Sequence, residues 1–372
     1  MEKILIDGTT FSKKTDGLTQ YGYSIILELV KDTSKDFTLL VRKNEIPETY
    51  SGKIKNLGSN FHLEEVDIPV IGPKRDIVFK RWLKANKNLF DIIYEPSAQY
   101  PAGSKGGIYT IHDILYEEFP EKLGKYSYLK KCYLHYVVHR GLRKAGRIIA
   151  VSQYTKNEIL KYHGKKFEKK ISVITEGYEH LNGYRINRDD SVVRDILSSC
   201  KNFFLYIGSS RGHKNLHNLF LAYQKACCDW DLVIVGRMDR LSNEDKILVN
   251  NINNTSKKVR FTGWIEDDQM YTILSQANAF VFPSKSEGFG IPILESYFFN
   301  VPLLCSDIPV FQEVAGDACI KFNPYDIDDI SRVLDVFSKM QKEEIDELLM
   351  RQKQQLSLYS WKNAAKDINE LL

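Results

Sequence analysis

Two successive sets of short apolar runs, each alternating with longer helical patterns, constrain the fold of this chain more than any other feature of its sequence. Such runs are typical of buried strands, and strands separated by helices predict a parallel sheet with helices on both faces. The expected strands are 3–7, 37–41, 91–94, 108–111, 147–151 and 171–174 in the first set, and 203–207, 231–235, 259–261, 279–282 and 302–305 in the second. We therefore expect an α/β protein with two doubly wound, Rossmann-like domains.

The polar stretch 184–199 separates the two sets and is expected to be a linker. We predict an N-terminal domain at 1–190 and a C-terminal domain at 200–355. The final segment, 356–372, has apolar residues at helical spacing and is expected to pack back on the N-terminal domain. Open α/β sheets bind ligands beyond the carboxyl ends of their strands, so two domains that face each other place a ligand in a central cleft.

Composition excludes several classes of protein. The 372 residues include no apolar stretch of about 20 residues, which argues against a membrane-spanning helix. The net charge of +4 does not by itself indicate nucleic-acid binding. The six cysteines form no C-x-x-C pair, so neither a zinc ribbon nor a disulfide framework is predicted. The first residues resemble a strand and not a signal peptide, so we expect a cytoplasmic protein.

The segment 283–295 carries the most chemical information. It follows an expected strand and opens a helix, because Pro292 suits a first helical turn. Gly288 and Gly290 let the backbone approach a ligand closely, and amides at a helix start suit a phosphate. Glu287 and Glu295 lie eight positions apart, and carboxylates accept paired hydrogen bonds from hydroxyl groups. This pattern predicts a nucleotide-sugar, whereas the two glutamates alone would favour a simple glycine turn with Glu295 exposed on a helix.

The stretch from Glu287 to Glu295 resembles the E-x7-E signature of the retaining glycosyltransferases of family 4, which have the GT-B fold. Further segments agree with that family in order and spacing: 149–155, 208–215, 232–236, 261–263 and 306–316. The region 109–113 is most similar to mannosyl- and rhamnosyl-transferases of bacterial surface polysaccharide assembly.

The resemblance implies a role for each matching position. Glu287 would contact hydroxyls of the donor sugar and Glu295 the ribose. The backbone amides of Gly288, Phe289 and Gly290 would hold the diphosphate. Lys214 would neutralise the leaving diphosphate, because fixed cations aimed at developing negative charge lower a barrier. From composition alone, Lys214 is equally well interpreted as a solvated surface lysine.

The loop before Lys214 departs from the family pattern. Relatives carry an arginine one or two positions from the first glycine of this loop, or directly before the lysine. This chain has Ser209 and His213 at those places, with Arg211 between them. Ser209 and Arg211 are therefore expected donor-binding residues, with Arg211 in place of the family's arginine.

Two positions in the first half complete the expected site. His112 ends the strand 108–111, and it resembles the family's first-domain histidine near the donor sugar, where it would guide the sugar or stabilise positive charge at the anomeric carbon. A structural histidine beside a capping Asp113 is an equally weighted alternative. Gly17 resembles the family's glycine loop, whose amides face the diphosphate and acceptor, although alone it is only a turn signal.

Basic and aromatic residues interleave in two segments of the first half. The segment 121–147 holds eight Lys or Arg and one acidic residue, with four tyrosines among them. A second stretch surrounds Trp82 and contains Lys74, Arg75, Lys80, Arg81, Lys84 and Lys87. Most charge runs are solvated faces, but basic and aromatic residues together suit an anionic membrane surface. The sequence thus predicts a peripheral contact at the inner face of the cell membrane.

Asp326-Ile-Asp328 has the form of the metal motif of another glycosyltransferase fold, but it precedes an expected helix and is better interpreted as a helix cap. We therefore expect no metal and no cofactor. The loop at Gly208 is not a Walker motif, because His213 occupies the second glycine position.

The resemblance implies a retaining glycosyltransferase that moves a hexose from a nucleoside-diphosphate sugar to a hydroxyl of a glycan or polyprenyl-diphosphate-linked acceptor. Mannose from GDP-mannose is favoured, and no nucleic acid is expected as a partner. The alternatives are another nucleotide-sugar enzyme of this fold, such as an epimerase or phosphorylase, an inactive nucleotide-sugar-binding protein, and a nucleic-acid binder. The intact glutamate pair argues against the last two.

Overall fold

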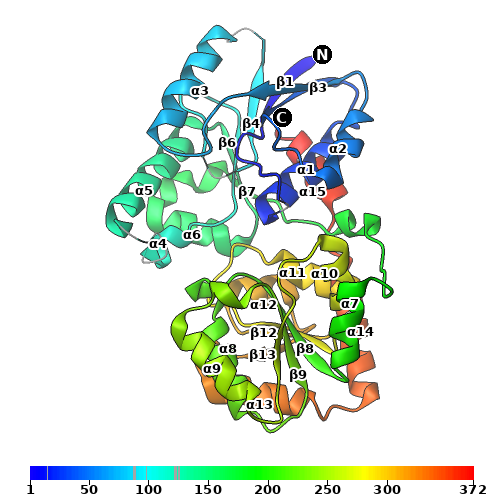
Figure 1. Cartoon of the computed structure of the whole chain (residues 1–372). Helices are drawn as coiled ribbons and strands as arrows, with labels where there is room; N and C mark the ends of the chain where they lie inside the picture. The colour runs from blue at the N-terminus through cyan, green and yellow to red at the C-terminus, as the bar shows by residue number, and fades with distance from the viewer. Residues whose placement is uncertain (15, 87–88, 98, 121–123, 125) are drawn as a thin grey trace. The chain divides into compact units, whose positions relative to one another are not determined.

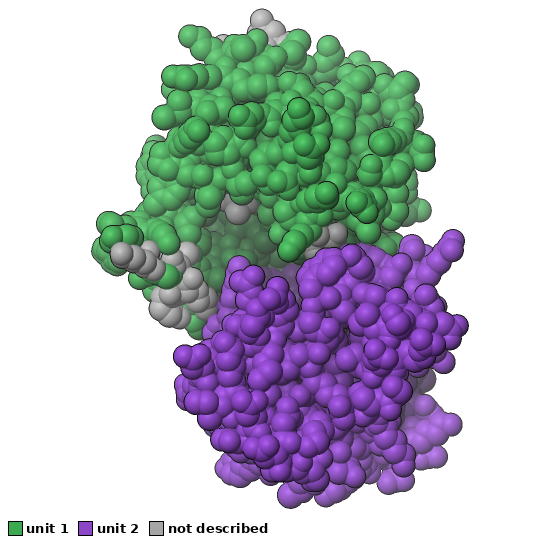
Figure 2. Space-filling view, in the orientation of Figure 1, with its two compact units in different colours: residues 1–180, 359–372 green, residues 181–358 purple. Residues whose placement is uncertain are grey.

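The computed structural model describes residues 1–14, 16–86, 89–97, 99–120, 124 and 126–372, which form two compact units (Figure 1, Figure 2). Unit 1 consists of Met1–His180 together with Tyr359–Leu372, and unit 2 consists of Leu181–Leu358. The C-terminal residues therefore belong to the same unit as the N-terminal half.

A seven-stranded sheet forms the centre of unit 1, in the order β3-β2-β1-β4-β5-β6-β7. All its neighbouring strands run parallel. The strands are β1 (Glu2–Asp7), β2 (Lys35–Arg42), β3 (Phe61–Val66), β4 (Ile92–Glu95), β5 (Ile108–Ile111), β6 (Arg147–Ala150) and β7 (Ile171–Val173). The central strands are almost wholly apolar and buried, as expected for strands covered on both faces.

Helices cover both faces of this sheet (Figure 1). They are α1 (Gly17–Leu29), α2 (Glu48–Lys55), α3 (Pro73–Ala85), α4 (Leu115–Glu118), α5 (Ser127–Lys144), α6 (Gln153–His163) and α15 (Trp361–Asn369), with the 3-10 segment η2 (Lys165–Lys170). The 3-10 segment η3 (Glu179–Gly183) contains the boundary between the two units in the chain. Ser152 caps α6 through a bond from the Thr155 amide, as predicted. The terminal helix α15 packs on α1, where the rings of Trp361 and Tyr21 lie 5.6 Å apart.

Unit 2 is built around a six-stranded parallel sheet in the order β10-β9-β8-β11-β12-β13. Its strands are β8 (Phe203–Ile207), β9 (Asp231–Val235), β10 (Val259–Phe261), β11 (Ala279–Phe282), β12 (Leu303–Ser306) and β13 (Ile320–Phe322). Its helices are α7 (Ser191–Ser199), η4 (Gly212–Lys214), α8 (Leu216–Lys225), η5 (Met238–Arg240), α9 (Asn243–Asn253), α10 (Asp267–Leu274), α11 (Ile291–Phe298), α12 (Pro309–Ala315), α13 (Ile327–Phe337) and α14 (Lys342–Leu356). Two doubly wound α/β domains are thus confirmed.

The stretch 184–199, which was expected to be a hinge or linker, belongs to unit 2, contains α7 and bonds to α10 of that unit. The Tyr184 hydroxyl donates to Asp267 at 3.3 Å, and the Asn187 amide donates to Thr272 at 3.1 Å. The predicted helix cap at Asp326 is confirmed, since its carboxylate accepts from two backbone amides of α13.

No helix among the described residues has both the length and the apolar character required to cross a bilayer.

Candidate functional site

The strand order of the second sheet reverses between β8 and β11, which are neighbours although β9 and β10 intervene in the chain. The loops that follow two such strands diverge, and the crevice at their carboxyl ends is where open α/β sheets bind ligands. These loops, 208–215 and 283–290, hold most of the expected donor-binding residues. The Lys285 amide donates to the carbonyl of His213 at 2.7 Å and joins them. The topology therefore brings together two motifs that are far apart in the sequence.

Lys214 and Glu287 form an ion pair between the two loops, with Nζ 2.6 Å from Oε1. Lys214 ends the turn η4, where its amide donates to the carbonyl of Arg211 at 2.8 Å. Its Nζ also lies 5.5 Å from the centre of the Phe282 ring, at the end of β11. Both charged side chains are partly exposed. The edge of the sheet thus presents a positioned cation and a carboxylate to solvent.

The glycine turn after Glu287 is fixed by its backbone. Gly290 has φ of 107° and precedes the first residue of α11, so a side chain there would be strained. An added Cβ would also lie 3.2 Å from carbons of Ile293 and Phe311. The ring of Phe289 is buried, which leaves its backbone as the group able to face a ligand. Pro292 lies in the first turn of α11, as predicted.

Glu295 is a buried residue on α11 and not an exposed helix position. Its Oε1 accepts a hydrogen bond from the hydroxyl of Tyr271 at 2.8 Å. Burial raises the pKa of the Glu295 carboxyl to about 7, against the lowering effect of the Tyr271 bond. Glu287 and Glu295 therefore lie in opposite environments: one is paired with a cation, and the other is desolvated beside a phenol.

Ser209 and Arg211 lie in the exposed part of the loop after β8. The hydroxyl of the buried Tyr206 donates to the carbonyl of Ser209 at 2.8 Å and fixes the start of this loop. The structure therefore places both residues on the same loop as Lys214, and their part in donor binding stays a prediction.

His112 follows β5 in unit 1, where both ring nitrogens face protein acceptors. Nε2 lies 2.9 Å from the carbonyl of Pro96, and Nδ1 lies 3.4 Å from Oε1 of Glu176. The ring also packs edge-on against Tyr21, with centres 4.5 Å apart. Burial lowers the pKa of His112, but Glu176 and the Pro96 carbonyl together raise it above its ordinary value. This geometry favours a positively charged imidazolium.

Gly17 is the first residue of α1 and does not lie in a free loop, because Asp16 caps the helix there. The Thr19 amide donates to Oδ1 of Asp16 at 2.9 Å. An added Cβ at Gly17 would meet nothing within 4 Å, so the side-chain side of this position is uncrowded.

Sequence patterns did not identify Glu176, which raises the pKa of His112, or Tyr271, which lowers the pKa of Glu295. Glu176 lies shortly after β7, and acidic residues beyond the carboxyl ends of strands are the signal that could have indicated it. Tyr271 lies within the amphipathic helix α10, where nothing distinguishes it from an ordinary core aromatic residue.

The basic stretch around Trp82 is not wholly a surface. Arg75 is buried, with 1% of its side chain exposed, and pairs with Asp7 at 2.5 Å and Glu95 at 3.5 Å. The expectation that Arg75 is a surface charge was wrong, because α3 directs this side chain toward the ends of β1 and β4. Lys87, Lys122 and Lys125 belong to the predicted basic segments but lie outside the described residues.

Comparison with known protein families supports the interpretation of both halves. The family described as glycosyl transferases group 1 matches residues 192–355, which lie in unit 2. The family described as glycosyltransferase family 4 matches residues 48–180 of unit 1.

Individual proteins that are similar to this chain are also named as glycosyltransferases. An O-antigen chain mannosyltransferase of Salmonella typhimurium, RfbU, is 32% identical over 219 residues, which cover 58% of this chain and 56% of that protein. O-antigen chain mannosyltransferase B of Escherichia coli is 27% identical over 298 residues, covering 76% of this chain and 74% of that protein. Among solved structures, WaaG, a glycosyltransferase involved in lipopolysaccharide biosynthesis, has a TM-score of 0.73 at 13% identity and covers 99% of both chains.

Proposed function

The chain belongs to the glycosyltransferases with the GT-B fold, and we propose that it is a retaining hexosyltransferase that takes its sugar from a nucleoside diphosphate. The observation that carries this proposal is the Lys214–Glu287 pair at the β8/β11 reversal, beside the glycine turn that opens α11.

The proposed reaction breaks the bond between the anomeric carbon and the diphosphate. Negative charge then develops on the leaving diphosphate, and Lys214 stabilises it electrostatically. Glu287 serves two purposes: it holds Lys214 in place, and it accepts hydrogen bonds from hydroxyls of the sugar. The amides of Gly288 and Gly290 bind the phosphate oxygens. The departing diphosphate removes the proton from the acceptor hydroxyl, so the new bond forms on the face that the leaving group vacates. In this proposal, Lys214 and the backbone amides take the place of a metal ion.

Glu295 binds the ribose in this proposal. Its pKa of about 7 means that the carboxyl is close to half ionised at neutral pH. Hydroxyl groups at the ribose donate better to an ionised carboxylate than to a protonated one, so donor binding draws the proton off Glu295. The affinity for donor should therefore fall as the pH is lowered below about 7, in parallel with protonation of this group.

His112 is proposed to act from unit 1, where Glu176 and the Pro96 carbonyl favour its charged form and raise its pKa above the ordinary value against the effect of burial. Because Pro96 and Glu176 already accept from both ring nitrogens, the imidazolium contributes through its charge and its carbon edge and not as a proton shuttle. A His112→Gln variant, which keeps the shape and loses the charge, should lower kcat more than it raises KM.

Mannose is the proposed sugar and GDP the proposed leaving group, because two similar proteins are named O-antigen mannosyltransferases. The proposed acceptor is a glycan of surface polysaccharide assembly carried on a polyprenyl diphosphate. These assignments rest on partial similarity, since the first relative is matched over 56% of its own length.

A peripheral membrane contact through α5 is proposed together with this acceptor. Tyr128, Leu129 and Tyr136 are large side chains of this helix that are more than half exposed. Lys130 and Arg143 are exposed on the same helix. Exposed aromatic and aliphatic groups beside basic ones suit the interface of an anionic bilayer. Reversal of charge at Lys130 should reduce co-sedimentation with anionic vesicles, and equal binding of variant and wild type would contradict the contact.

A donor screen tests the function directly. The full chain is melted in the presence of nucleoside-diphosphate sugars, and the sugar that raises Tm is then supplied with acceptor and a chelator. Proton NMR of the product reports the anomeric configuration. Retention with turnover in chelator supports the proposal, whereas inversion or metal-dependent turnover contradicts it. Conversion of donor without acceptor would indicate an epimerase or a hydrolase instead.

Variants separate the roles of the two glutamates. Glu287→Ala should lower kcat by about 100-fold or more, because it releases Lys214 and removes a contact with the sugar. Glu295→Ala should mainly raise the dissociation constant for donor. Glu244→Ala serves as the control, since this side chain is 79% exposed in the same unit. Unchanged kinetics in both test variants would show that the site has been assigned to the wrong residues.

A further inference from the structure

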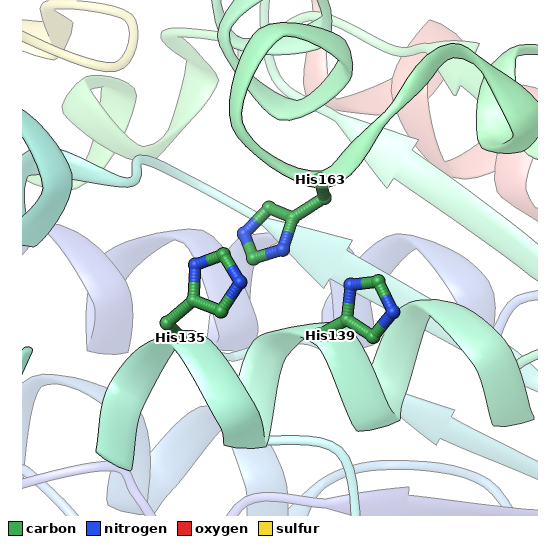
Figure 3. Close-up of side chains that lie close together, drawn as sticks. All are labelled: His135, His139 and His163. Atoms are coloured by element: carbon green, nitrogen blue, oxygen red, sulfur yellow. The ribbon is translucent and has the colours of Figure 1, made fainter. Parts of the chain in front are cut away.

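Three histidines converge in unit 1, outside the proposed donor site (Figure 3). His135 and His139 lie one helical turn apart on α5, so their side chains project from the same face. His163 is the last residue of α6, and its ring lies over the other two. One nitrogen from each ring lies within 4.8 Å of the others.

Neighbouring groups orient two of the rings. Oε1 of Glu117 lies 2.5 Å from Nδ1 of His135. An ionised carboxylate only accepts, so Nδ1 carries the proton and Nε2 presents its lone pair. The hydroxyl oxygen of Tyr116 lies 3.2 Å from Nε2 of His163 and can accept from it, which leaves Nδ1 of His163 as the lone-pair nitrogen. A carboxylate behind a histidine is the outer contact that metal-binding histidines commonly have.

Two ring nitrogens in this cluster lack the partners that buried polar atoms normally have. Nδ1 of His139 and Nδ1 of His163 are buried and have no hydrogen-bond partner among the described residues. Leaving a buried nitrogen unpaired is costly, and each such atom requires an explanation. A bound cation would satisfy both atoms at once.

The protonation states also suit a metal. Burial and the other two histidines lower the pKa of His163 to about 4. Burial, Lys166, His135 and Arg143 lower the pKa of His139. Neutral imidazole is the form that binds metals. Lys166 and Arg143 repel a bound cation, whereas the carboxylate of Glu117 attracts it.

We propose that His135, His139 and His163 bind one divalent transition metal ion, with zinc as the ion that this ligand set fits. Imidazole nitrogens bind zinc at about 2.0–2.1 Å in a tetrahedral site, which places neighbouring nitrogens about 3.3 Å apart. The ligand atoms now lie within 4.8 Å of one another, so binding requires the three side chains to rotate and bring them closer. The fourth position takes water. The ion fastens the middle of α5 to the end of α6 and takes no part in sugar transfer.

Cobalt titration tests the site in the full chain carrying no histidine tag. The protein is treated with chelator, and Co²⁺ is added while the visible d–d absorption is recorded. One equivalent of Co²⁺ should give the intense band of a tetrahedral site, and Zn²⁺ should abolish it. Absence of the band, or binding of Co²⁺ without a nitrogen-ligand spectrum, would overturn the proposal.

Matched variants locate the ion. His139→Gln should abolish the band, because it removes one of three ligands while keeping a side chain of similar size. Glu117→Gln should weaken Co²⁺ binding by about tenfold or more, because it removes the group that orients His135. His62→Gln is the control, since His62 is exposed and pairs only with Asp36 among the contacts described. Circular dichroism of the metal-free variants checks folding. A band that persists in His139→Gln, or an equal loss in His62→Gln, would refute the assignment.

Discussion

Replacement of the buried carboxyl of Glu295 by an amide should stabilise the protein at alkaline pH and not at acidic pH. The pKa of this group rises from 4.5 to about 7 on folding, because burial disfavours its charged form. The folded protein therefore holds the proton more tightly than the unfolded chain does. The stability that this group contributes is complete below pH 4.5 and is lost as the pH rises through about 7. At 1.36 kcal/mol per pKa unit, this shift lowers the free energy of unfolding by about 3 kcal/mol once the pH is above that range.

The assay is urea unfolding of wild type and Glu295→Gln at about pH 5 and about pH 8. Most of the predicted loss of wild-type stability occurs between these two pH values. Glutamine has the same shape and can still accept the hydrogen bond from Tyr271, so the two proteins should be nearly equally stable at the lower pH. At the higher pH, the variant should be more stable by about 2–3 kcal/mol. Subtracting the free energy of unfolding of wild type from that of the variant cancels the contributions of all other titrating groups.

Tyr271→Phe provides the matched test of cause. This change removes the hydrogen bond that lowers the pKa of Glu295, so the pH at which wild-type stability declines should move upward. A difference between wild type and Glu295→Gln that stays constant from acid to alkaline pH would refute the reasoning. A variant that is less stable than wild type at the higher pH would refute it as well.

Two further predictions concern unit 1. Arg75→Met should lower the free energy of unfolding by about 3–5 kcal/mol, because it leaves two buried carboxylates without their cation; a loss below about 1 kcal/mol in chemical denaturation would contradict this. Gly177→Ala should loosen α15, because an added Cβ would lie 2.0 Å from the backbone nitrogen of Trp361. Hydrogen exchange of residues 361–369 should then accelerate, whereas Gly52→Ala, with nothing within 4 Å of its new Cβ, should leave it unchanged.

The strands that sequence patterns missed are those that carry the weakest pattern. β3 alternates irregularly between exposed and partly buried residues at the edge of its sheet, and β13 has only three residues. Neither presents the continuous apolar run that a strand covered on both faces requires. Their place is decided by pairing with β2 and β12, which no local window of sequence contains.

The histidine cluster was also missed, although its first two members carry a recognisable spacing. His135 and His139 lie four positions apart, which places them on one face of any helix. His163 belongs to the next helix, and only the packing of α6 against α5 gives the pair its third ring. A pair of histidines on an amphipathic helix is otherwise unremarkable.

The amino-acid sequence by itself determined the local elements and their chemistry. Apolar runs set the central strands, Pro292 and Asp326 set helix starts, and the positive φ of Gly290 matches a position that the motif reserves for glycine. These features follow from steric and hydrogen-bonding rules that act over a few residues.

Tertiary structure alone decided which of these groups meet and in which charge state. Lys214 and Glu287 are 73 positions apart and become partners because the order of parallel strands reverses between β8 and β11. Glu295 has the sequence context of a surface glutamate, yet its burial makes it a weaker acid in spite of the hydrogen bond from Tyr271. Strand order and solvent exclusion are properties of the whole packed unit, so no stretch of the chain encodes them in isolation.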